Sequence, residues 1–253
     1  MELSSDVNTI FAYNDKIHPY NKNVISFMIK NKRSTYMLLD RVKSHFIYTY
    51  KNYLSECCIV IEQSIRDSKA ERSRSPSKTY NPSLFAISTN IRGLIDKKLK
   101  ELYDRKNFDF SSTKRFVDLL LSEYSIPDLY EKEKILGEFR ERYLVESEKR
   151  AVEKINNFLI FFYKFDEINL NKYTLYSHWL DQIKQSKNIS IFKNKTDYED
   201  MKLAAEFLCY NQEFRSLYFF SCDKDCCKSI EIVAKEYNQK IGKVTLIEKS
   251  HGS

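Results

Sequence analysis

The amino-acid sequence predicts an α/β fold, a three-layer α/β/α arrangement around a central, mainly parallel sheet, interrupted by an all-helical insertion. Residues 216–221 form a short apolar and aromatic run, which is typical of a buried parallel strand. Apolar residues at helical spacing dominate the middle of the chain, as in residues 91–103 and 135–143. Four glycines and four prolines in 253 residues are too few for a turn-rich all-β fold.

The first predicted strand, residues 1–5, leads directly into Asp6 and Asn8. Its strand propensity is weak because it holds two serines and one central apolar residue. Residues 10–13 are an alternative first strand, and Asp15 would then be the first acidic residue after it. Either register places a carboxylate beyond the end of a strand.

An acidic helix start is predicted at Asp197. Thr196 and Glu199 have the spacing of a capping box, so the first turn of this helix carries several carboxylates. Asp200 lies in line with an apolar stripe, so we expect its carboxylate at the rim of the core. The stripe consists of Leu203, Ala204, Phe207 and Leu208.

A second acidic cluster, Asp223 and Asp225, follows the apolar run 216–221. Ligands of open α/β sheets bind beyond the carboxyl ends of the strands, so distant carboxylates can meet at this edge and share a divalent cation. The alternative interpretation is that these acidic residues only cap helices and end strands.

Three segments in this order resemble the motifs of PIN-domain ribonucleases. Asp6 and Asn8 are similar to the family's Asp-x-Asn after the first strand. Asp200, before a small-residue helix, is similar to its third acidic position, and residues 219–225 are similar to the fourth. The resemblance covers the two ends of the chain and leaves the middle unmatched.

The resemblance implies a metal-dependent endoribonuclease that hydrolyses RNA phosphodiester bonds. Asp6, Asp200 and Asp223 would be both the catalytic carboxylates and the ligands of Mg²⁺ or Mn²⁺, which activates water and offsets charge on the scissile phosphate. Asn8 would orient Asp6 or a water molecule. Asp197 and Asp225 would support the site from outside.

One position departs from the family pattern. The family carries a glutamate on the helix after the second strand, and His45 stands there, between Val42 and Phe46. Glu56 lies roughly 16 Å further along the helix axis, too far to replace it, whereas Asp40 is closer. His45 itself has three interpretations: a softer metal ligand, a phosphate contact, or a packed core residue.

The predicted domain organisation is discontinuous. Residues 1–66 and 158–250 would form the PIN-like α/β domain, and residues 67–157 the helical insertion. Within the insertion, the polar residues 68–78 predict an exposed loop, because they lack an apolar period. Residues 128–157 predict a charged amphipathic helix with many opposite charges three or four positions apart.

Basic residues concentrate at the start of this insertion. Residues 69–115 hold 12 Lys or Arg and 5 Asp or Glu, so their surplus of +7 equals the net charge of the whole chain. Such a segment can bind a phosphate backbone, although a solvated helix face has the same composition. The predicted nucleic-acid contacts are Arg72, Arg74, Lys97, Lys98 and Lys100.

Composition predicts a cytoplasmic chain with no membrane partner, because no signal peptide and no long apolar run are evident. RNA, single-stranded or structured, is the predicted partner; the family resemblance adds a homodimer and an inhibitory protein as candidates. Two other functions remain open. One is a PIN-like module that has lost catalysis and binds RNA or supports an assembly, and the other is a helical protein-interaction protein without nuclease activity.

Overall fold

The computed structural model describes all residues except 17, 75–83, 107–109, 187–196 and 250–253. Its strands are β1 (Glu2–Ser5), β2 (Thr35–Leu39), β3 (Lys164–Ile168), β4 (Tyr218–Ser221) and β5 (Val244–Leu246). Its helices are α1 (Val7–Asn14), α2 (Asn21–Lys30), α3 (Asp40–Arg74), α4 (Leu84–Lys106), α5 (Phe110–Ser122), α6 (Ile126–Glu131), α7 (Glu133–Leu159), the 3₁₀ turn η1 (Leu170–Lys172), α8 (Thr174–Lys184), α9 (Asp197–Glu213) and α10 (Lys224–Glu236).

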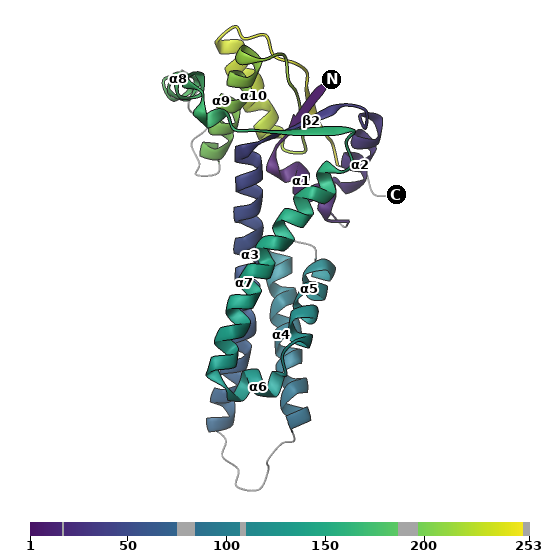
Figure 1. Ribbon diagram of the computed structural model, residues 1–253, viewed down its shortest axis with the longest axis vertical. Helices are drawn as coiled ribbons and strands as arrows, with labels where there is room; N and C mark the ends of the chain where they lie inside the picture. Colours follow the sequence, from purple (N-terminus) through teal and green to yellow (C-terminus); the bar gives the residue numbers. More distant parts are fainter. Residues whose placement is uncertain (17, 75–83, 107–109, 187–196, 250–253) are drawn as a thin grey trace. The chain divides into compact units, whose positions relative to one another are not determined.

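The five strands form one parallel sheet in the order β3-β2-β1-β4-β5. The chain therefore winds outward from β1 first to β2 and β3, and then to β4 and β5. Because crossover connections are right-handed, this reversal places helices on both faces of the sheet. Figure 1 shows α1 and α2 on one side and α9 and α10 on the other. The structure confirms the predicted α/β class with a parallel sheet.

The core lies where the central strands meet these helices. Leu3, Tyr36 and Phe220 are at most 1% exposed, as expected of parallel strands covered on both faces. The Tyr36 ring stacks on Phe162 with centroids 4.9 Å apart, and its hydroxyl lies 2.8 Å from the Ser5 hydroxyl. The sheet thus buries a polar pair beside its aromatic packing, and that pair is hydrogen-bonded.

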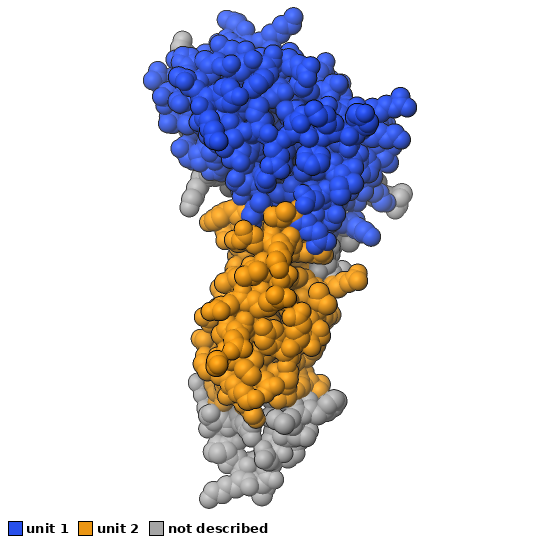
Figure 2. Space-filling view, in the orientation of Figure 1, with its two compact units in different colours: residues 1–47, 153–253 blue, residues 48–152 orange. Residues whose placement is uncertain are grey.

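The chain divides into two compact units, shown in Figure 2. Unit 1 comprises Met1–Ile47 and Glu153–Ser253 and holds the whole sheet; unit 2 is the helical segment Tyr48–Val152. The boundaries fall inside α3, after Ile47, and inside α7, after Val152, whereas the sequence predicted them after residues 66 and 157. Within unit 2, the Arg140 guanidinium binds both oxygens of Glu62 at 2.5 and 2.6 Å, which pairs an otherwise buried carboxylate.

Three local predictions can be compared with these elements. The first strand is β1, which confirms residues 1–5, whereas residues 10–13 belong to α1. The predicted loop at 68–78 is wrong as far as Arg74, because α3 continues through these good helix formers; residues 75–78 lie outside the described residues. The predicted helix 128–157 is two helices, because the backbone of Lys132 is extended between α6 and α7.

Gly242 offers a test of the packing between β4 and the segment before β5. A Cβ atom at Gly242 would overlap the backbone carbonyl of Leu217, which has no freedom to move aside. We expect Gly242→Ala to lower the free energy of unfolding by about 1–3 kcal/mol, measured by denaturant unfolding. Gly93→Ala is the matched control: it meets nothing within 4 Å on a helix and should be neutral or stabilising. Equal effects of the two variants would contradict this packing.

Candidate functional site

The carboxyl end of β1 presents Asp6, which caps α1. Its Oδ1 accepts hydrogen bonds from the Thr9 amide at 3.1 Å and the Thr9 hydroxyl at 2.6 Å. The side chain is 3% exposed, and Oδ2 accepts no hydrogen bond of good geometry from the described residues. A buried carboxylate oxygen without a donor is costly, so this atom is available to a ligand.

Burial raises the pKa of Asp6 to about 6. The hydroxyls of Thr9 and Ser221 act against this shift, whereas the charge of Asp223 increases it. Asp223 is therefore close enough to Asp6 for the two carboxylates to repel each other. A cation between them would reverse that repulsion.

The carboxyl end of β4 presents Asp223, which caps α10. Its Oδ1 accepts the amides of Asp225 and Cys226 at 2.9 and 3.2 Å. Its amide donates to the Ser221 hydroxyl at 2.8 Å. The Asn8 side chain donates to Asp223 Oδ2 at 3.0 Å and so joins the ends of β1 and β4. Asn8 therefore holds Asp223, whereas the resemblance implied that it orients Asp6 or a water molecule.

Asp200 lies half-buried in the first turn of α9. The charges of Asp6, Asp200 and Asp223 all contribute to raising the pKa of the buried Cys226 thiol, for which desolvation is the main cause. The three predicted carboxylates thus each lie within electrostatic range of one thiol at the start of α10. Among the described residues, no group of three or more His, Cys, Asp or Glu side chains is arranged to hold a metal ion.

The remaining predicted site residues lie further out. Asp225 is exposed in the first turn of α10. Asp15 ends α1, so Asp6 and not Asp15 follows the first strand. The side chain of Asp197 lies outside the described residues.

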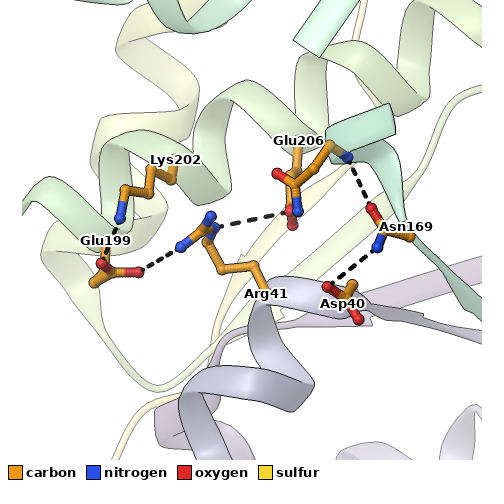
Figure 3. Close-up of polar contacts among 7 residues, drawn as sticks. Asp40, Arg41, Asn169, Glu199, Lys202 and Glu206 are labelled. Atoms are coloured by element: carbon orange, nitrogen blue, oxygen red, sulfur yellow. Dashed lines mark hydrogen bonds and ion pairs between the residues drawn. The ribbon is translucent and has the colours of Figure 1, made fainter. Parts of the chain in front are cut away.

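The end of β2 carries a second polar cluster, drawn in Figure 3. Arg41 reaches from α3 toward α9, where its Nη1 lies 2.9 Å from Glu199 Oε2 and its Nε 3.8 Å from Glu206 Oε1. Lys202 also binds Glu199, at 2.7 Å. Asp40 accepts a hydrogen bond from Asn169 at 3.4 Å, which joins the ends of β2 and β3.

Glu206 is the least solvated acid of this cluster. It is fully buried and neither oxygen accepts a hydrogen bond within the described part of the chain. Desolvation raises its pKa to about 8; the charge of Arg41 opposes the shift, and Asp40 and Glu199 add to it. Arg41 is thus the positive side chain that favours the ionised form of this buried acid.

His45 lies next to the same cluster. It is half-buried, and desolvation together with the charges of Arg41 and Lys202 lowers its pKa, while Glu199 acts in the opposite direction. At the place of the expected second acid the chain therefore has a histidine within electrostatic range of Glu199, Arg41 and Lys202. Sequence reasoning missed Arg41 and Glu206, although the position of Arg41 two residues after a strand was a usable signal.

The predicted nucleic-acid contacts belong to unit 2. Lys97 and Lys100 are exposed on α4, but Lys98 pairs with Asp67 at 2.7 Å, which neutralises part of the basic surplus. The side chains of Arg72 and Arg74 lie outside the described residues.

Comparisons with protein-family models, curated proteins and solved structures gave no match. The helices described by the structure include none that is long and apolar enough to cross a membrane.

The raised pKa of Asp6 makes a prediction about stability. Since the folded chain holds this proton more tightly than the unfolded one, the free energy of unfolding falls as the pH rises from about 4 to about 6. Asp6→Asn cannot ionise but still caps Thr9. We expect it to raise the free energy of unfolding by about 1–3 kcal/mol at pH 7 and to leave it unchanged below the unfolded-state pKa of about 4. Urea unfolding at both pH values measures this; Asp225→Asn, an exposed neighbour, should show no such pH-dependent gain.

A double-mutant cycle tests the dependence of Glu206 on Arg41. At pH 9, where Glu206 is ionised in the folded chain, Arg41→Met should lower the free energy of unfolding by about 1–3 kcal/mol, because it leaves a buried carboxylate without its counter-charge. Adding Glu206→Gln should recover part of that loss, with a coupling of about 0.5–3 kcal/mol. Lys43→Met, which breaks the more exposed pair with Glu167, is the control and should cost less than about 1 kcal/mol. Additive effects of the Arg41 and Glu206 changes would rule the dependence out.

Proposed function

We propose that the chain is a PIN-like, metal-dependent endoribonuclease that acts in the cytoplasm. The observation that carries the proposal is the electrostatic interaction of Asp6 with Asp223 across the β1–β4 junction, with Asp6 Oδ2 buried and without a hydrogen bond of good geometry from the described residues. This junction is where the strand order reverses, the usual ligand-binding position of an open parallel sheet. All six cysteines are unpaired, in keeping with a reducing compartment.

The donor set at this junction fits a hard cation. Carboxylate oxygens are the preferred ligands of Mg²⁺ and Mn²⁺. Asp6 and Asp223 would hold the ion, with Asp200 contributing from the first turn of α9. A cation held there would activate a water molecule and offset charge on the scissile phosphate.

The chain's own residues prepare these ligands. Thr9 occupies Oδ1 of Asp6 through two hydrogen bonds, which fixes the carboxylate and leaves Oδ2 for a ligand. Asn8 and the amides at the start of α10 fix both oxygens of Asp223. Such support keeps ligands oriented before the ion or the substrate arrives.

A second candidate function is supported by the cluster at the end of β2. His45 stands at the position of the expected second acid, and Arg41 and Lys202 lie in the same cluster, so basic side chains are present where the family pattern has a carboxylate. A PIN-like module that binds RNA without cutting it, or supports an assembly, would have this balance of charge.

The proposal is tested by Mn²⁺-dependent cleavage of a mixed-sequence single-stranded RNA. Loss of an outer-sphere partner typically costs 10- to 100-fold, so Asp6→Asn and Asp223→Asn, which remove ligands, should lose at least about a hundredfold in rate. We also expect Asp200→Asn to lose activity. Glu231→Gln, an exposed acid on α10, should keep it.

The native chain decides between the two candidates. Metal-dependent cleavage by the native chain that persists in Glu231→Gln but is lost in the three aspartate variants would support the nuclease. RNA binding by fluorescence anisotropy without any cleavage would contradict it and favour the binding module; His45→Glu would then test whether the missing acid is the cause.

A further inference from the structure

β3 is an edge strand of the sheet. Within the part of the chain that the structure describes, its one strand neighbour is β2, to which it pairs over all five residues. The other side of an edge strand presents unpaired backbone N–H and C=O groups, which can pair with another chain. Edge strands therefore need either protection or a partner.

Apolar exposure is concentrated beside this edge. Tyr163 is 85% exposed and Ile160 is 74% exposed, the two highest values among the large apolar side chains that the structure describes. Phe165, inside β3, is 43% exposed. Three such side chains thus lie within six residues of the chain, in and immediately before the edge strand. Clustered exposed apolar residues indicate an interaction site.

We propose that β3 pairs antiparallel with β3 of a second copy of the chain, on a two-fold axis through Phe165, so that the two sheets join. In a symmetric antiparallel pair the residue on the axis faces its own copy. An axis through Lys164, Asp166 or Glu167 would place like charges opposite each other, which is destabilising. An axis through Phe165 places two aromatic rings opposite each other and puts Lys164 of each copy opposite Asp166 of the other.

The charges of β3 support this register. Lys164 and Asp166 lie on one face of the strand and pair within the chain at 2.9 Å, with side chains 61% and 46% exposed. An ion pair this exposed adds little stability, so its partners can be exchanged between copies at small cost. Glu167, on the opposite face, is already paired with Lys43 at 2.5 Å. Lys164 and Asp166 of β3 therefore form the one complementary pair of charges that β3 presents to the same strand of a second chain.

Charge reversal in the full chain tests the register, with the association state measured by sedimentation over a dilution series. The native chain should dimerise. Lys164→Asp and Asp166→Lys should each weaken dimerisation at least about tenfold, because each creates two like-charge pairs. An equimolar mixture of these two variants should associate again, since every cross-strand pair is then opposite in sign. Circular dichroism confirms that each variant is folded.

Lys184→Asp is the matched control. Lys184 pairs with Asp181 on the exposed face of α8 in the same unit, so its reversal should leave dimerisation unchanged. A native chain that stays monomeric at its highest soluble concentration would overturn the proposal. So would a dimer that neither β3 variant weakens, or variants that do not recover when mixed.

Discussion

The candidate site depends on the position of β1 in the middle of a parallel sheet. Because the chain winds outward from β1 in both directions, the segments after β1 and β4 turn toward opposite faces of the sheet. Asp6 and Asp223 are the first acidic residues after these two strands. The Asn8–Asp223 hydrogen bond then joins the two segments, so one amide connects two helix starts that the topology alone brings together.

The structure buries two acids, Asp6 and Glu206, in different surroundings. Asp6 has hydroxyl and amide donors on one oxygen and a neighbouring negative charge, whereas Glu206 has no close donor and one guanidinium. Burial opposes ionisation of both acids, whereas the donors to Asp6 and the guanidinium beside Glu206 act against that effect. Buried acids with raised pKa values make this end of the sheet a candidate functional site.

The sequence was sufficient for elements with local signals. An acidic first turn followed by an apolar stripe predicted α9, and an aromatic run that ends in an acid predicted β4 and Asp223. It was not sufficient for contacts between distant segments. Asn8 and Asp223 are 215 positions apart, and Arg41 and Glu199 are 158 apart, so nothing in either local pattern indicates the partner. Helix propensity also outweighed polarity in residues 68–74, where the lack of an apolar period led to a wrong loop prediction.

Three cysteines near Asp6 and Asp223 can report local opening of this part of the sheet by their chemical reactivity. Cys222, Cys226 and Cys227 are buried at the start of α10, and desolvation raises the pKa of each thiol. Only a thiolate reacts readily with alkylating reagents, so these side chains are modified when α10 separates from the sheet and not before. The alkylation rate of Cys226 therefore measures how often the structure around Asp6 and Asp223 opens locally. A ligand that binds both carboxylates should lower this rate.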